Sequence, residues 1–356
     1  MKPVSVLIVD DSATIRRILT AVLSSDPEIE VVGAAPEASV ARQMIKDLNP
    51  DVITLDVEMP HMNGLEFLEK IMRLRPQPVV MVSTLTQKGT EITLAALELG
   101  AVDYYAKPTE NVMALLQSGA CDLIEKVKSA AHANVRPLPP RRASVSPPLE
   151  TAFDPGNTVV AIGSSTGGVE ALIEVLSHFP KNCPPTVITQ HMPPHFTTTF
   201  AERLDRLCQP HVTEAKSGTP LEIGSIYLAP GGTQHFEICG TGALCCRLEE
   251  AEPVNGHRPS VDVLFHSVAR CAKSRAIGVE LTGMGRDGAA GLLEMRRKGA
   301  VTIGQDAASS VVYGMPRVAF EIGAVQIQLP LEKIGPEILR QCKDHSEKGL
   351  RHACGG

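Results

Sequence analysis

The sequence contains no tryptophan, and aromatic residues make up only 3 % of its 356 residues. Its buried cores must therefore rest mainly on Leu, Ile, Val, Ala and Met. The 43 % of hydrophobic residues is enough for two ordinary cores. A chain of this length favours two domains.

Signals for secretion, membrane insertion and zinc binding are also missing. The N-terminus reads as a strand rather than a signal peptide, and no apolar run reaches the ~18 residues of a membrane span. The nine cysteines form no CxxC pair, and the adjacent Cys245 and Cys246 cannot easily bridge each other. We expect free thiols, no zinc site and a soluble cytoplasmic protein.

The charge balance excludes one class of partner. The formal net charge is −6, and no long block of one sign interrupts the chain. General nucleic-acid binding relies on Lys and Arg to neutralise phosphates, so we predict no nucleic-acid partner.

The chain alternates between apolar strand-like segments and amphipathic helical segments, which predicts an α/β fold with parallel sheets. In residues 1–131 this pattern indicates a flavodoxin-like domain with five parallel strands. The expected strands are Val4–Val9, Glu30–Ala34, Val52–Leu55, Val79–Val82 and Val102–Tyr105.

A linker is expected at residues 132–156, because 134–150 holds five Pro and three Arg without apolar periodicity. The alternation resumes in residues 157–342, which predicts a doubly wound, mostly parallel α/β domain with a hairpin at Gln234–Leu248. Residues 343–356 read as a disordered tail. The expected strands of this domain are Val159–Ile162, Thr186–Gln190, Ser225–Leu228, Ala276–Leu281 and Ala300–Ile303.

Polar residues follow successive strands of the first domain. Asp10 and Asp11 follow the first strand, and Asp56 follows the third. The C-terminal ends of parallel strands meet at one edge of the sheet. Several carboxylate side chains at such an edge favour the binding of a hard cation such as Mg²⁺. Ser83 and Lys107, which is followed by Pro108, end the fourth and fifth strands, so a hydroxyl and a cation reach the same edge. Singly, each polar residue also fits a turn or a helix cap.

Together these residues resemble the receiver domain of two-component response regulators over residues 4–125. The resemblance implies that Asp56 accepts a phosphoryl group from a histidine kinase, with Mg²⁺ held by Asp10, Asp11 and Asp56. It also implies that Ser83 and Tyr104 rearrange on phosphorylation and that Lys107 pairs with the phosphoryl group.

A glycine-rich turn opens the second domain. Gly163, Ser165 and Gly167 have the spacing of a nucleophile elbow between a strand and a helix, although such turns also cradle phosphates. His191 and Asp287 follow two other strands, and a hydroxyl, an imidazole and a carboxylate at one edge predict a serine triad.

Each triad member has a structural alternative. His191 also fits a hydrogen-bonded histidine at a strand end, and Asp287 fits a helix cap. A metal pair of His191 with His195 is opposed by the lack of a third ligand at matching spacing and by the intervening Pro193 and Pro194.

Several strings of the second domain resemble the catalytic domain of the chemotaxis protein-glutamate methylesterases over about residues 158–340. In this family Ala is usual where Ser164 stands, and the resemblance also implies that Thr166 and Met284 lie near the nucleophile. We expect their N–H groups to form the oxyanion hole. The strings begin at Ile162, Gln190, Tyr227, Arg258, Leu281 and Tyr313.

The resemblance implies hydrolysis of glutamate methyl esters and deamidation of glutamines on chemoreceptor helices, without a cofactor for the ester chemistry, giving adaptation in chemotaxis. It also implies that the unphosphorylated receiver blocks the catalytic edge until Asp56 is phosphorylated. A non-catalytic receptor-binding module is the alternative. A DNA-binding output is opposed by the acidic balance and the absence of a terminal helix-turn-helix pattern.

Overall fold

The computed structural model describes residues 2–59, 62–84, 87–107, 120–137 and 153–353. The chain divides into two compact units, Met1–Ala143 and Ser144–Gly356. The division falls within the expected linker at 132–156, of which residues 138–152 lie outside the described residues.

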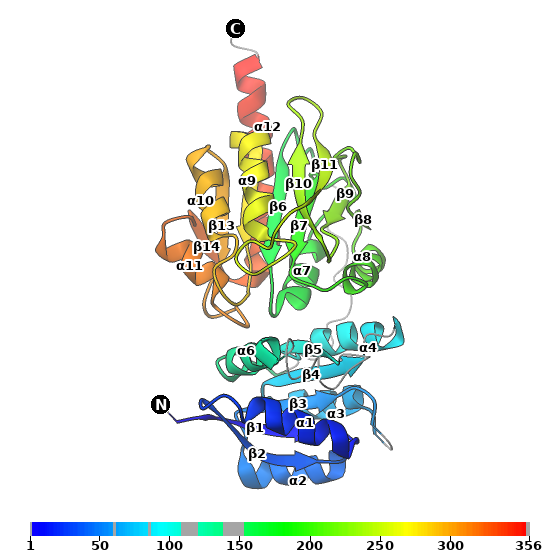
Figure 1. The fold of residues 1–356 in the computed structure, drawn as a ribbon. Helices are drawn as coiled ribbons and strands as arrows, with labels where there is room; N and C mark the ends of the chain where they lie inside the picture. Colours follow the sequence, from blue (N-terminus) through cyan, green and yellow to red (C-terminus); the bar gives the residue numbers. More distant parts are fainter. Residues whose placement is uncertain (1, 60–61, 85–86, 108–119, 138–152, 354–356) are drawn as a thin grey trace. The chain divides into compact units, whose positions relative to one another are not determined.

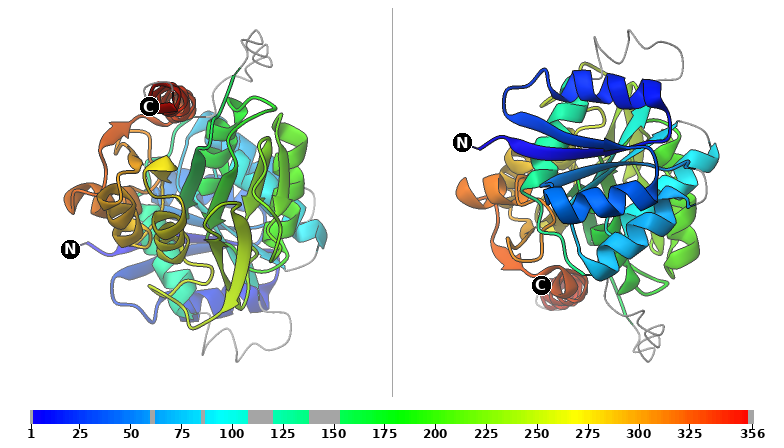
Figure 2. Two further views of the ribbon diagram at one scale, coloured as in Figure 1. Left: turned by 90° about the horizontal axis from the view of Figure 1, so that it is seen from above. Right: turned by 90° about the horizontal axis from the view of Figure 1, so that it is seen from below.

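The first unit contains a five-stranded parallel sheet in the order β2-β1-β3-β4-β5, which confirms the flavodoxin-like prediction. Figure 2 shows α1 and α6 on one side of this sheet and α2, α3 and α4 on the other. The strands are β1 (Val4–Val9), β2 (Ile29–Ala35), β3 (Val52–Asp56), β4 (Val79–Thr84) and β5 (Asp103–Lys107). The helices are α1 (Ala13–Leu23), α2 (Ala38–Leu48), α3 (Gly64–Leu74), α4 (Gln87–Glu98) and α6 (Ala120–Ala131).

Local sequence explains where two of these helices begin. The Ser12 hydroxyl accepts a hydrogen bond from Ile15 N at 3.4 Å, and the Asn63 side chain accepts one from Glu66 N at 2.8 Å. Such caps satisfy N–H groups that the first helical turn leaves without partners.

The second unit contains a seven-stranded sheet in the order β14-β13-β12-β6-β7-β9-β8, and all its strand pairs are parallel (Figure 1). The strands are β6 (Val159–Ser164), β7 (Thr186–Gln190), β8 (His211–Glu214), β9 (Ser225–Leu228), β12 (Ala276–Glu280), β13 (Val301–Gln305) and β14 (Ile327–Leu329). The central strand β6 lies between β7 and β12, so the chain crosses from one half of the sheet to the other beside it. Ligands bind at such switch points, outside the carboxyl ends of the strands.

The helices of this unit pack in two groups: α9 contacts α10 and the hairpin strand β10, while α7 contacts α12. Figure 1 shows α9 and α10 side by side. The helices are α7 (Gly168–Ser177), α8 (Phe196–Leu207), α9 (Val261–Cys271), the short η1 (Lys273–Arg275), α10 (Ala289–Arg297), α11 (Met315–Glu321) and α12 (Leu331–Ala353). None of the helices in the described ranges is long and apolar enough to span a membrane.

The predicted hairpin is confirmed as the antiparallel pair β10 (Gln234–Cys239) and β11 (Cys245–Glu250). Gly240 turns the chain at a φ of +106°, and a Cβ there would lie 2.2 Å from the Ala243 carbonyl oxygen. Only glycine tolerates both constraints.

Three features of this unit differ from expectation. The edge strands β8 and β14 and the helices α11 and α12 were not predicted. Helix α12 continues to Ala353, so the expected disordered tail from residue 343 is wrong up to that point. The core is largely aliphatic as expected, but its largest fully buried side chains include five phenylalanines: Phe179, Phe196, Phe200, Phe236 and Phe265.

Candidate active site

The three predicted triad residues follow three neighbouring strands. Ser165 follows β6, His191 follows β7, and Asp287 lies in the loop after β12. Ser165 N donates to Thr282 O at 3.0 Å and His191 N donates to Ser164 O at 3.1 Å, which ties the three strand ends together. The edge predicted from the sequence is therefore formed.

The two serines at the end of β6 have different surroundings. Ser164 is fully buried, and its hydroxyl donates to Gln190 Oε1 at 2.6 Å. Ser165 is partly exposed, and its carbonyl accepts from Gln190 Nε2 at 2.9 Å. Of the two serines, Ser165 is therefore the one that has surface for a substrate to contact.

The backbone around Ser165 has no room for larger residues. A Cβ on Gly283 would lie 2.8 Å from Ser165 Cβ, and one on Gly168 would lie 2.0 Å from Gln190 Oε1. Glycine at these positions lets the neighbouring chain approach the serine and lets Gln190 fix the turn.

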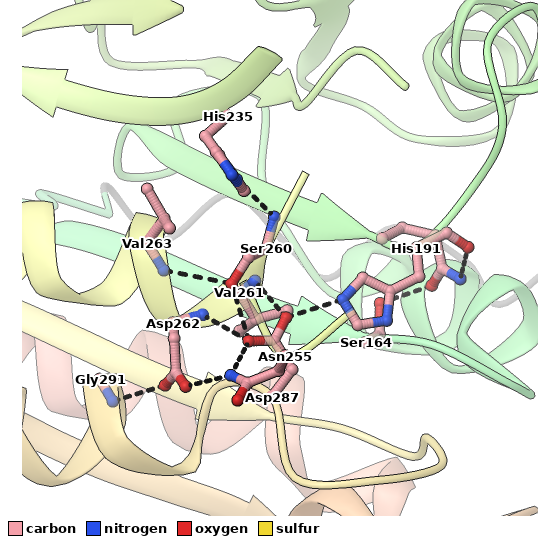
Figure 3. Close-up of polar contacts among 11 residues, drawn as sticks. Ser164, His191, His235, Asn255, Ser260, Val261, Asp262, Val263, Asp287 and Gly291 are labelled. Carbon is pink, nitrogen blue, oxygen red and sulfur yellow. Dashed lines mark hydrogen bonds and ion pairs between the residues drawn. The ribbon is translucent and has the colours of Figure 1, made fainter. Parts of the chain in front are cut away.

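His191 and Asp287 form a direct pair. His191 Nε2 lies 2.9 Å from Asp287 Oδ2, and both side chains are almost completely buried (Figure 3). An ionised carboxylate only accepts hydrogen bonds, so Nε2 carries the hydrogen and Nδ1 has a free lone pair when the ring is neutral. Nδ1 is buried and has no hydrogen-bond partner among the described residues. It is the atom available as a base.

Asp287 receives four further hydrogen bonds from residues at the start of α9 and the loop before it (Figure 3). Its Oδ1 accepts from Asn255 Nδ2 at 2.9 Å, Ser260 Oγ at 2.7 Å and Asp262 N at 3.2 Å. Its Oδ2 accepts from Val261 N at 2.7 Å. An anion at the N-terminus of a helix is also stabilised by the helix dipole.

The ionisation of Asp287 follows from these contacts. Burial disfavours its charge, but His191 and the hydrogen bonds from Asn255 and Ser260 lower its pKa well below the usual range. Asp287 therefore remains a carboxylate at neutral pH and fixes the His191 tautomer.

His257 stacks on His191, with ring centroids 3.7 Å apart and an angle of 12° between the planes. Burial and the neighbouring His191 lower the pKa of His257 to about 4. His257 is therefore neutral at neutral pH and adds no competing positive charge when His191 takes up a proton.

The predicted oxyanion residues lie beside the serine. Thr166 is the next residue, and its carbonyl accepts from Thr282 Oγ1 at 3.0 Å. Met284 is half-buried in the loop after β12, and its N–H makes no hydrogen bond within the described part of the chain. This N–H is therefore available to a substrate oxygen.

Sequence reasoning missed Asn255, His257 and Ser260 as members of this site. Ser260 had a usable signal, because a serine before an apolar helical run is typical of an N-cap, and its Oγ lies 3.5 Å from Val263 N. The sequence around Asn255 and His257 contains no such signal, since their contacts come from chain segments distant in the sequence.

The receiver unit forms a separate acidic site. Carboxylate oxygens of Asp10, Asp11 and Asp56 lie within 4.8 Å of one another. Lys107 Nζ lies 2.8 Å from both Asp10 and Asp56. Burial raises the pKa of Asp56 to about 6, while Lys107 opposes this shift by charge and by a hydrogen bond. Three clustered oxygen ligands fit a hard divalent cation.

The other predicted receiver residues are buried nearby in the sheet. Ser83 is 2 % exposed at the end of β4 and Tyr104 is 5 % exposed in β5. Burial also raises the pKa of Tyr104 well above its usual value, so its hydroxyl stays protonated. Pro108, which follows Lys107, lies outside the described residues.

Comparisons with known proteins assign a family to each of the two units. Residues 160–338 match the CheB methylesterase family and residues 6–118 match the response regulator receiver domain. The chain is 61 % identical to a protein-glutamate methylesterase/protein-glutamine glutaminase of Rhizobium johnstonii, over 97 % of this chain and 98 % of that one. It is 58 % identical to a protein of the same description from Caulobacter vibrioides, over 95 % and 98 %.

A solved structure supports the fold of the second unit. The CheB methylesterase catalytic domain of Thermotoga maritima is 37 % identical, with a TM-score of 0.51, covering 52 % of this chain and 99 % of that one. With both family matches and relatives that cover nearly its whole length, the chain belongs to the CheB family of protein-glutamate methylesterases/protein-glutamine glutaminases that carry a response regulator receiver domain.

Proposed function

We propose that the second unit hydrolyses glutamate γ-methyl esters, and deamidates glutamines, on the cytoplasmic helices of chemoreceptors. The observation that carries this proposal is the buried His191–Asp287 pair, whose free Nδ1 stands at the same sheet edge as the Ser165 hydroxyl. The names of the relatives supply the substrate class. Removal of methyl groups from receptors would give adaptation in chemotaxis.

The reaction begins when Ser165 Oγ attacks the ester carbonyl carbon and His191 Nδ1 takes the serine proton. Asp287 stabilises the imidazolium through Nε2. The N–H groups of Thr166 and Met284 would hold the oxyanion, a contribution of ~10²–10³ in rate for each donor in comparable sites. His191 then returns the proton to the leaving methanol, or to ammonia from a glutamine.

The second half of the reaction uses the same residues. Water attacks the acyl group on Ser165, and Nδ1 of His191 accepts a proton from that water. The Ser165–carbonyl bond breaks, the proton passes back to Ser165 Oγ, and the glutamic acid that is released loses its remaining proton to solvent to give the free carboxylate. This use of the ring differs from the chymotrypsin type, in which Nδ1 faces the aspartate and Nε2 the serine.

We further propose that the receiver unit controls this activity. Asp56 would accept a phosphoryl group from a histidine kinase, and Asp10, Asp11 and Asp56 would hold Mg²⁺ to neutralise charge on the phosphoryl oxygens. Lys107 forms ion pairs with Asp10 and Asp56 in this structure and would pair with the phosphoryl group after phosphorylation. Ser83 and Tyr104 would rearrange in response.

The proposed chemistry is tested by methanol release from a methylated receptor. Ser165→Ala should lose activity, because it removes the proposed nucleophile and the neighbouring Ser164 is fully buried. Ser164→Ala is the matched control: it removes the bond to Gln190 but leaves the nucleophile, so activity should persist. The proposal is wrong if Ser165→Ala keeps activity while Ser164→Ala loses it.

The proposed regulation needs its own experiment. A small-molecule phosphodonor should raise methanol release by the full chain and leave Asp56→Asn at its basal rate. A chain that begins near residue 150 should be more active than the unphosphorylated full chain if the receiver inhibits. Equal rates for the two chains would refute inhibition by the receiver without affecting the triad assignment.

A further inference from the structure

One pair of cysteines in the second unit is placed for a reaction that the esterase does not use. Cys239 ends β10 and Cys245 begins β11, and the two residues are directly opposed in the antiparallel register. Their sulfur atoms lie 3.1 Å apart. Opposed residues of antiparallel strands have Cα atoms about 4.5–5.5 Å apart, within the range that a disulfide requires.

The two thiols lie on the accessible face of the hairpin. They share it with the opposed pair Glu237 and Arg247, whose charged groups are 3.0 Å apart. Neighbouring residues such as Ile238 and Cys246 alternate to the opposite face and are almost completely buried. Cys239 and Cys245 are both partly exposed, so a small oxidant can reach them.

The surroundings of the pair act on the Cys239 thiol. The contact with Cys245 is the largest cause that raises its pKa, and the charge of Arg247 opposes this shift. Either sulfur atom can be the donor in this contact, and Cys245 Sγ also lies 3.8 Å from the Cys239 carbonyl oxygen. Either cysteine can therefore attack first, and the other is then the resolving thiol.

Other cysteines of the unit are poorly reactive by comparison. Burial raises the pKa of Cys183, Cys208, Cys246 and Cys342 to about 12. These thiols remain protonated at neutral pH, and the thiolate is the reactive form. The opposed pair therefore stands out by its position, with two partly exposed thiols in contact.

We propose that Cys239 and Cys245 are a redox modification site at which a low-molecular-weight disulfide, such as oxidised glutathione, forms a cross-strand disulfide. The thiolate of one cysteine attacks one glutathione sulfur, which forms a mixed disulfide and releases one glutathione thiolate. The other cysteine then attacks the sulfur of the first, which releases the second glutathione. Two electrons and two protons pass from the cysteines to glutathione disulfide, which becomes two thiols.

The disulfide would lock the end of the hairpin without reaching the triad. At the opposite end of β10, His235 Nδ1 accepts from Ser260 N at 3.1 Å, and Ser260 in turn supports Asp287. Cys239 lies four positions along the extended strand from His235, a distance of about 13 Å. Oxidation should therefore leave kcat of ester hydrolysis unchanged.

The experiment uses the full-length protein, reduced, freed of reductant and incubated with oxidised glutathione. Trypsin releases residues 217–247 as one peptide that contains Cys239, Cys245 and Cys246. We expect this peptide to lose two hydrogens and two alkylatable thiols. Cys239→Ser should abolish the change, whereas Cys246→Ser, in the same peptide, should retain it.

Two results would overturn the proposal. The first is a wild-type peptide that keeps its thiols, or carries only glutathione adducts, when exposed to oxidised glutathione. The second is an oxidised peptide in Cys239→Ser together with an unreactive Cys246→Ser, which would place the bond elsewhere. A third result concerns the claim that the disulfide does not affect the triad. This claim is wrong if oxidation lowers kcat of Cys246→Ser but not of Cys239→Ser.

Discussion

Replacement of Asp287 by asparagine tests the triad most directly. Five donors converge on this carboxylate: His191 Nε2, Asn255 Nδ2, Ser260 Oγ, and the backbone N–H groups of Val261 and Asp262. An asparagine has the same shape but only one accepting oxygen. Its amide group must therefore face some of these donors.

The size of the effect follows from the His191 tautomer. If the new amide donates to Nε2, the ring proton moves to Nδ1, and the lone pair that would act as the base is lost. In a serine protease this substitution lowers kcat about 10⁴-fold, and we expect a similar fall here. A buried donor that loses its acceptor also costs about 1–3 kcal/mol of folding free energy.

Asp262→Asn is the matched control. Asp262 is also a buried carboxylate at the start of α9, and it accepts from Asn255 Nδ2 and Gly291 N, both at 2.7 Å. It has no hydrogen bond to His191. Asp262→Asn should therefore lower kcat by no more than about tenfold, the effect expected from the loss of one such hydrogen bond.

The assay is methanol release at saturating methylated receptor, with circular dichroism to confirm that both variants are folded. A folded Asp287→Asn protein that keeps kcat within tenfold of the wild type would refute the role of Asp287. Equal losses in both variants would show that the carboxylate cluster matters as a whole, and that the pair with His191 has no special role.

The same variant has a pH signature. The folded-state pKa of Asp287 lies below its unfolded value of 3.8, so its contribution to stability is present above that pH and is lost as pH falls through the folded pKa. The difference in unfolding free energy between wild type and Asp287→Asn should therefore shrink in strong acid. A difference that grows in acid would contradict this sign.

Three further predictions concern other buried groups. Burial raises the pKa of Glu280 well above 4.5, so the unfolding free energy of the wild type falls as pH rises above that value. In urea melts, the stability of Glu280→Gln relative to wild type should therefore rise by up to about 1.4 kcal/mol per pH unit. A difference between the two proteins that does not change with pH would contradict this. Gly283→Ala places a Cβ 2.3 Å from Met315 Sδ and should lower the unfolding free energy by about 1–3 kcal/mol, as measured by thermal unfolding. A variant as stable as the wild type would show that the loop moves to make room for the methyl group. Lys107→Met should raise the pKa of Asp56 above about 6 in a carbon-13 NMR titration; an unchanged titration would refute the ion pair.

Prediction from the sequence succeeded where a strong local pattern meets a general rule. Alternating strands and helices predicted both parallel sheets, and polar residues after the strands predicted their shared edge. It failed for β8 and β14, which have only four and three residues, and for α12, which carries an internal proline, Pro336, and few apolar residues near its end. Short edge strands and polar helical ends show little hydrophobic periodicity in the sequence, because tertiary contacts determine whether they form.

The choice between Ser164 and Ser165 shows the limit of spacing. The elbow pattern selects Ser165, but the structure gives the physical reason: Ser164 is buried against Gln190, and Ser165 is partly exposed. That difference depends on β7, which begins over twenty residues later in the chain.

By itself, the sequence determined that an alcohol, an imidazole and a carboxylate follow three parallel strands, because side-chain periodicity and strand ends are local properties. Only the tertiary structure decided that β12 and β7 flank β6, that Nδ1 of His191 remains free, and that Asn255, His257 and Ser260 surround the pair. These contacts join segments far apart in the chain, and their energies arise only when the chain packs.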